Sequence, residues 1–365
     1  MPSTTAEFFI TSLSLIPTSI LVQMSCGDIL IRLQKTRREV LCGIFRTLFG
    51  SFPEFALATI ALLRNDVLLA QTSLIGAFLS NCLLLLGICF LSGGIANEEM
   101  IYPVLIARAG SQLLVASLTG ITLPTAFQLW KQEEASGNEA TSRVAAFMLL
   151  IVFSCYVVFL YITHSNYTQR KPIFSSIQSL AVTSTVLAYP FIGEKNFNEL
   201  LELRKRSLPQ PHLRLGISIA VALMSSALYV VSSIFVVKSK KIPSETLGIS
   251  KSFVGLVLLP LLLTVPEQVS CALSGKLKRV EWVIEEIISS CVRILFFILP
   301  VLVILGWGFG ITDMTLFFDG FQVTILSLTV LLVNYLIQGN GTWFEGIILL
   351  CTYALFGTAA WNYPK

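Results

Sequence analysis

The stretch FGSFPEFALATIALLRND, residues 49–66, places a proline and a glutamate at the start of an apolar segment of membrane-spanning length. Pro53 lacks a backbone N–H and clashes with the preceding helical turn, so carbonyl oxygens there lose their partners. Glu54 is unfavourable at membrane depth unless it is paired, protonated or bound to a cation. Such groups are tolerated inside a membrane where they line a cavity or bind a ligand. The stretch therefore predicts a helix interruption that presents polar groups to a site.

The polypeptide has the composition of a protein that crosses the lipid bilayer many times. Of its 365 residues, 55% are hydrophobic and 13% are charged, and the mean hydropathy is +0.79. Apolar segments of about 17 to 25 residues predict an all-α protein with ten transmembrane helices, near residues 7–24, 44–64, 67–95, 101–121, 144–163, 213–237, 245–273, 280–306, 319–338 and 343–361. A further stretch, Ile173 to Gly193, is rich in Ser, Thr and Gln, and we expect an interfacial or loop helix there.

The lysines and arginines are concentrated in alternate loops, and this asymmetry predicts the orientation in the membrane. The main basic clusters lie at residues 32–38, 170–214 and 276–279, in the first, fifth and seventh loops. We therefore expect the odd-numbered loops to face the cytosol and both termini to face the lumen or the exterior. The first apolar segment lacks the cleavage site of a signal peptide, so we expect it to remain a membrane helix.

The chain shows signs of two related halves. The long polar stretch 164–212 separates five predicted helices in residues 1–163 from five in residues 213–365. A shift of 213 residues places Ser51-Phe52-Pro53-Glu54 on Thr264-Val265-Pro266-Glu267. Because five is odd, the halves are expected to enter the membrane in opposite senses, as an inverted repeat.

Two such elements would build a site for a hard cation. A single Pro-Glu pair could be a simple kink with a neutral glutamate, but its recurrence favours a site. Facing each other, the elements would gather the Glu54 and Glu267 carboxylates, the Ser51 and Thr264 hydroxyls, and loosened carbonyls, all of them oxygen ligands that calcium accepts. Two carboxylates in a dry site cannot both stay charged without a cation, so a divalent cation would displace a proton.

The stretch from GSFPEF to LSGG, residues 50–94, resembles the first repeat of the calcium/proton exchangers of the cation/calcium exchanger superfamily. That repeat has the pattern G-N-x-x-E, then Q-x-S-x-x-G-S, then S-N, and the residues at the matching spacing are Gly50, Glu54, Gln71, Ser73, Gly76, Ser80 and Asn81. GISKSFVGLVLLP (248–260), ILPVLVILGW (298–307) and the segment 331–364 resemble the second half of the same family.

The resemblance implies secondary transport, in which calcium moves one way and protons the other, usually across a vacuolar membrane. Glu54 and Glu267 would be the acidic pair that binds calcium or protons, within site elements at 50–81 and 263–293. The resemblance implies that Gln71, Ser80 and Asn81 help to shape the first-repeat side. The further supporting positions of the predicted site are Gly50, Pro53, Pro266, Gln268 and Arg293. The most N-terminal helix of the family is missing here, which agrees with a lumenal N-terminus.

Three positions depart from the family pattern where the cation would bind. Ser51 and Thr264 replace asparagines, and Arg293 replaces a glutamine. Arginine stays charged in proteins, so we expect Arg293 to plug the site in part, unless Glu286, two helical turns earlier on the same face, holds it aside. Two leading hypotheses stay open: a cation antiporter for calcium or a related divalent cation, and a degenerate exchanger fold that acts as a regulatory or structural membrane partner. A passive pore is a third and less favoured hypothesis, because two interrupted repeats with paired glutamates favour alternating access.

Other classes of protein have no support in the sequence. Eight cysteines without a C-x-x-C pair and two histidines do not form the pattern of a disulfide framework or a soft-metal site. A Gly-rich phosphate loop, a Walker lysine motif and an H-E-x-x-H element are all missing. We therefore predict no enzyme activity and no cofactor, with calcium and protons as transported substrates; the oligomeric state is not indicated.

Overall fold

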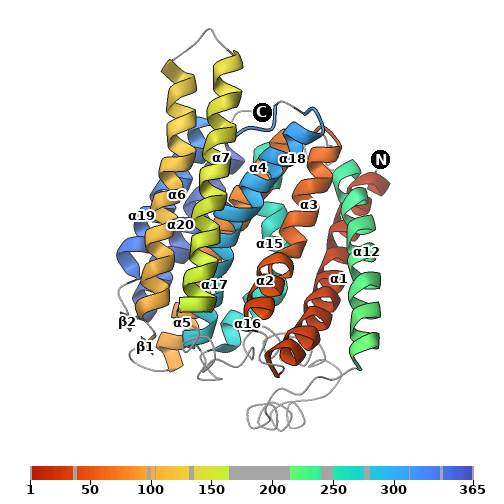
Figure 1. The fold of residues 1–365 in the computed structure, drawn as a ribbon, viewed down its shortest axis with the longest axis vertical. Coiled ribbons are helices and arrows are strands. Elements are labelled where there is room, and N and C mark those ends of the chain that lie inside the picture. Colours follow the sequence, from red (N-terminus) through yellow and green to blue (C-terminus); the bar gives the residue numbers. More distant parts are fainter. Residues whose placement is uncertain are drawn as a thin grey trace.

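The computed structural model describes residues 2–35, 39–96, 100–102, 104–130, 135–163, 214–239, 250–274, 280–311, 313–337 and 340–363. Figure 1 shows these residues as a bundle of helices that run mostly along its long axis. The predicted helix at Ile173 to Gly193 and the loop 164–212 lie outside the described residues.

The first half consists of α1 (Pro2–Lys35), α2 (Glu39–Phe49), α3 (Phe52–Leu63), α4 (Val67–Leu79), the π-helical turn η1 (Ser80–Leu85), α5 (Leu86–Ala96), β1 (Met100–Ile101), α6 (Val104–Trp130), α7 (Ala135–Val158) and η2 (Phe159–Thr163). The second half consists of α12 (Leu215–Ser239), α14 (Lys251–Phe253), η3 (Val254–Leu258), α15 (Leu259–Leu263), α16 (Val265–Ser274), α17 (Val280–Arg293), η4 (Ile294–Ile298), α18 (Leu299–Gly308), α19 (Gly320–Leu336), β2 (Asn340–Gly341) and α20 (Trp343–Trp361). The two short strands pair in antiparallel fashion.

The helical fold is confirmed, but the count of ten membrane spans is not. Six of the described helices are long and apolar enough to cross a membrane, or up to seven if the bent pair 254–263 and 265–272 counts as one span. Part of the difference comes from a short helix, since the predicted segment 319–338 forms α19 with only 17 residues, and part comes from interruptions. The predicted segment 44–64 is divided between α2 and α3, and the predicted segment 245–273 bends by 60° after Leu263. Each interruption leaves pieces that are shorter than the membrane is thick.

Both Pro-Glu elements lie at the start of a helix. Pro53 and Pro266 are the second residues of α3 and α16, where a missing N–H breaks no bond within the helix. The carbonyl of Pro53 accepts a hydrogen bond from Tyr229 Oη at 3.2 Å. Glu54 and Glu267 therefore lie in the first turns of their helices, where the positive end of the helix dipole stabilises a carboxylate.

The two interrupted segments run in opposite directions. In Figure 1, α3 lies above α2, whereas α16 lies below α15.

Residues of the first half contact residues at corresponding positions of the second half. Asn81 Nδ2 donates to Ser290 Oγ at 3.3 Å, and the sulfur atoms of Cys82 and Cys291 are 3.2 Å apart. Both pairs are separated by 209 residues, so Ser-Asn-Cys of η1 faces Ser-Ser-Cys of α17.

Gly76 allows α4 to approach the second half closely. A Cβ atom at Gly76 would lie 2.5 Å from the carbonyl oxygen of Leu256 and 2.7 Å from that of Gly255, both in η3. These are backbone atoms, so a side chain would force α4 and η3 apart, at a typical cost of about 1–3 kcal/mol or more. We expect Gly76→Val to lower the melting temperature of the purified protein clearly. Gly357→Val is the control, because a Cβ there has no neighbour within 4 Å; equal melting temperatures for both variants would contradict this packing.

Candidate cation-binding site

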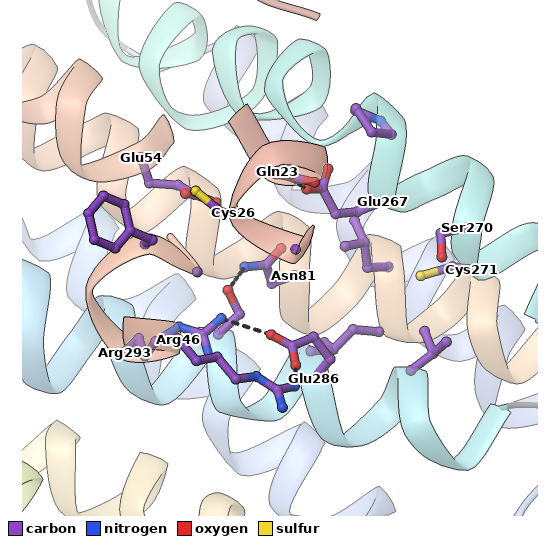
Figure 2. Close-up of a pocket in the computed structure, with 18 of the residues that line it drawn as sticks. Gln23, Cys26, Arg46, Glu54, Asn81, Glu267, Ser270, Cys271, Glu286 and Arg293 are labelled. Carbon is purple, nitrogen blue, oxygen red and sulfur yellow. Dashed lines mark hydrogen bonds and ion pairs between the residues drawn. The ribbon is translucent and has the colours of Figure 1, made fainter. Parts of the chain in front are cut away.

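One cavity contains both glutamates of the predicted acidic pair. Its volume of about 120 Å³ would hold several water molecules. Its walls come from α1, α2, α3, η1, α16 and α17 (Figure 2). The predicted site residues that line it are Gly50, Glu54, Asn81, Pro266, Glu267 and Arg293.

The two carboxylates are buried and only partly satisfied. Within the described part of the chain, the Oε2 atoms of Glu54 and Glu267 are buried and have no hydrogen-bond partner. Glu267 Oε1 accepts a hydrogen bond from Gln23 Nε2 at 2.5 Å. A buried carboxylate oxygen without a partner is unfavourable, and a cation or a proton would satisfy it. The cavity therefore suits a positively charged ligand.

Apart from the ion-paired Arg46, Glu286 and Arg293, the further polar groups that line the cavity are neutral. Figure 2 shows Asn81 between Glu54 and Glu267 in this view, with its amide bonded to Ser290. In the ranges that the structure describes, no group of three or more His, Cys, Asp or Glu side chains is arranged to hold a metal ion. A cation bound by the two glutamates would therefore take its other ligands from amides, hydroxyls or water, which calcium accepts.

Three predicted site residues do not line the cavity: Thr264, Ser80 and Gln268. Thr264 contacts each of the other two. Thr264 Oγ1 lies 3.0 Å from Ser80 Oγ, accepts a hydrogen bond from Gln268 Nε2 at 3.0 Å and donates to the carbonyl of Pro260 at 2.9 Å. Gln268 also donates to the carbonyl of Leu261 at 2.9 Å. These bonds satisfy polar groups at the bend between α15 and α16, so Thr264 shapes the interruption and does not face a cation there.

Ser51 and Gln71 also do not line the cavity, and they form hydrogen bonds with other residues. Ser51 Oγ accepts a hydrogen bond from Arg293 Nε at 3.1 Å. Gln71 Nε2 donates to the carbonyls of Thr315 and Phe317 at 3.0 and 3.1 Å. Asn81 follows Gln71 by ten residues along one helical segment, a rise of about 15 Å. Only Asn81 of these two therefore reaches the cavity.

Arg293 lies in the cavity wall and is held by Glu286. Its side chain is almost completely buried, and Nη2 donates to Glu286 Oε1 at 3.1 Å. Glu286 also forms an ion pair with Arg46 of α2, so it bridges two arginines. Among the residues that the structure describes, no ion pair joins Arg293 to Glu54 or to Glu267. Of the two arrangements considered for Arg293, the structure has the pairing with Glu286 and not the expected partial plugging, because the guanidinium is held by that carboxylate.

The sequence analysis missed Gln23 and Arg46, which both line the cavity. The only signal for Gln23 was an amide near the end of the first apolar segment, predicted at residues 7–24. Arg46 comes eight residues before Glu54, in what was predicted as a continuous apolar helix. Neither position belongs to the motifs that carried the family resemblance.

The fold and the cavity define a class of polytopic membrane protein in which interrupted helices present buried glutamates to one cavity. The sequence agrees with this class. The family model described as sodium/calcium exchanger protein matches residues 6–162 and 217–362. The chain belongs to this family, and the resemblance inferred from its motifs is confirmed.

Curated relatives match nearly the whole chain. The vacuolar calcium ion transporter of Schizosaccharomyces pombe is 28% identical over 362 residues, which cover 98% of this chain and 79% of the relative. The Ca(2+)/H(+) antiporter of Synechocystis sp. is 26% identical over 366 residues, covering 99% and 92%. The solved structure of native YfkE has a TM-score of 0.73 at 19% identity and covers 97% of this chain and 91% of that chain. At that identity, the structural match shows a shared fold.

Proposed function

We propose that this protein is a secondary active cation antiporter that exchanges calcium, or a related divalent cation, for protons across an internal membrane by alternating access. The observation that carries the proposal is one cavity lined by Glu54 and Glu267, each with a buried oxygen that lacks a partner. The names of the two curated relatives support calcium and protons as substrates. The alternative of a degenerate fold without transport is not favoured, because the acidic pair is present and Arg293 is paired with Glu286.

The proposed mechanism is competition for the same carboxylate oxygens. Without a cation, two neighbouring carboxylates in a cavity with little water repel each other, and a proton relieves that repulsion. Calcium accepts six to eight oxygens in a flexible geometry, so it would bind both glutamates together with neutral groups and water. Because calcium and protons need the same atoms, the arrival of one releases the other. No bond in a substrate is made or broken, so the protein acts as a carrier and not as an enzyme.

We further propose that the chain forms ten spans in two inverted halves, residues 1–163 and 213–365. The opposite directions of α3 and α16 support this arrangement, as do the contacts between residues 209 positions apart. The cavity is lined by Gln23 to Leu30, near the basic end of α1. If the basic loops face the cytosol, the cavity opens toward the cytosol and would take up calcium for transport into a vacuole or another internal compartment.

A comparison of cations tests the proposal. The purified protein is reconstituted into liposomes with an acidic interior, and uptake of calcium, manganese, sodium and potassium is measured. We expect uptake of calcium, or of calcium and manganese, because these cations accept oxygen ligands in a flexible geometry. A proton ionophore that removes the pH gradient should abolish it. If none of the cations is taken up, the result would support the degenerate fold. Uptake of sodium or potassium alone would contradict a divalent substrate.

A further inference from the structure

The amide of Gln23 lies where a cation would bind to Glu267. Gln23 is on α1, and its Nε2 atom is 2.5 Å from Glu267 Oε1. Both residues line the cavity, and Figure 2 shows their side chains directed toward each other. An amide N–H carries a partial positive charge, so it satisfies a carboxylate oxygen in the absence of a cation. Glu267 thus has one oxygen bonded to Gln23 and one buried oxygen without a partner among the described residues.

The two glutamates differ in the side-chain hydrogen bonds that they accept. The described residues give Glu54 no side-chain donor like Gln23, and its Oε2 atom is buried without a hydrogen-bond partner. The hydroxyls of the two interruptions make their contacts elsewhere, because Thr264 donates to the carbonyl of Pro260 and Ser51 Oγ lies 3.4 Å from Ser290 Oγ. Among the described residues, Glu267 is therefore the member of the pair that accepts a hydrogen bond from another side chain.

We infer that Gln23 sets the cation affinity of the site, as a built-in hydrogen-bond donor that competes with the cation for Glu267. This inference rests on the proposed function. Every cation that uses both oxygens of Glu267 must first displace the Gln23 amide, and the free energy of that displacement is the same for each. A divalent cation still binds, because it interacts strongly with two carboxylates. A monovalent cation gains less from the same carboxylates, so it remains the weaker ligand, and its affinity is lowered by the same factor.

Removing the donor is therefore expected to tighten the binding of all such cations by the same factor. Gln23→Met keeps the length of the side chain but cannot donate a hydrogen bond. A hydrogen bond to a charged group stabilises by about 1.5–3 kcal/mol, which corresponds to roughly tenfold or more in affinity. Binding of calcium-45 to the detergent-solubilised full chain gives the dissociation constant for calcium, and its displacement by NaCl gives the constant for sodium. We expect both constants to fall by about tenfold.

Two further variants support the test. Gln23→Asn shortens the side chain by one methylene so that its amide cannot reach Glu267, and it should shift both constants in the same direction with less effect on packing. Ser25→Ala on the same helix is the control, because Ser25 Oγ donates to the carbonyl of Leu21 within α1; its constants should match those of the wild type. Melting temperatures verify that each variant is folded.

The possible results are distinct. Unchanged calcium and sodium constants in a folded Gln23→Met or Gln23→Asn protein would overturn the inference and leave the proposed function intact. Weaker calcium binding in these variants would also overturn it, since Gln23 would then be a ligand and not a competitor. A wild-type protein that binds no cation would overturn the proposed function together with the inference.

Discussion

Replacing either Glu54 or Glu267 by glutamine is expected to abolish proton-driven calcium uptake and to leave the protein folded. Glutamine has nearly the same size as glutamate, but it carries no charge. Calcium would lose one of the two anionic ligands that line its cavity, and the remaining neutral groups would not compensate for the dehydration of the ion. A loss of several kcal/mol in a cavity with little water corresponds to at least about 100-fold in affinity. Uptake of calcium-45 into vesicles under an imposed pH gradient measures the effect.

The control for these variants is Glu139→Gln. Glu139 is a glutamate of α7 that forms an ion pair with Arg143 and does not line the cavity. We expect this variant to transport like the wild type, because its ion pair is partly exposed and of a kind that contributes little. If Glu54→Gln and Glu267→Gln both transport at the rate of the control, the two glutamates are not the cation site.

Replacing Glu286 by glutamine is expected to reduce calcium uptake by roughly tenfold or more, and a second substitution, Arg293→Gln, is expected to restore it. Glu286 is the described ion-pair partner of Arg293. A buried charge without its partner is strongly unfavourable, so the guanidinium would turn to a carboxylate in the same cavity and compete with calcium. In the double variant, the buried guanidinium of Arg293 is gone, and the guanidinium of Arg46 that remains is partly exposed. A loss of roughly 1.4 kcal/mol corresponds to the tenfold effect.

This pair of variants separates a specific charge effect from general damage to the structure. If the double variant stays as inactive as Glu286→Gln, Glu286 is needed for the fold and not to hold Arg293 aside. Arg293→Gln alone should transport within a few fold of the wild type, because Glu286 keeps its ion pair with Arg46. A large gain of calcium uptake in Arg293→Gln would show that the arginine blocks the wild-type site, in contradiction to the geometry described above.

The interruptions and the acidic pair could be predicted because their signals are local. The length of an apolar segment and the order Pro-Glu are visible along the chain, and the recurrence of the pair pointed to one shared site. The geometry of each interruption was harder to predict from the sequence. The residues around Ser51 and Thr264 show where a helix stops, but whether a piece is long enough to span the membrane depends on the angle at which the next helix begins.

Which polar side chains reach the cavity could not be read from the sequence. Gln71 and Asn81 belong to one motif, yet Gln71 bonds to carbonyls of Thr315 and Phe317, far along the chain. Thr264 matches Ser51 in the aligned halves, but it bonds within the bend of its own segment. Gln23 and Arg46 enter the cavity because α1 and α2 pack beside α16 and α17. Such placement depends on tertiary packing, which leaves no local pattern in an apolar helix.

The central claim is that calcium and protons bind alternately to the carboxylates of Glu54 and Glu267. It is tested most directly by recording calcium and proton movements together, in proteoliposomes that contain a pH-sensitive dye and have no pH gradient at the start. When calcium is added outside, the account predicts calcium entry and a simultaneous rise in internal pH as protons leave, and it predicts that Glu54→Gln and Glu267→Gln lose both signals together. Calcium entry without any change in internal pH, with other ion gradients absent, would contradict it.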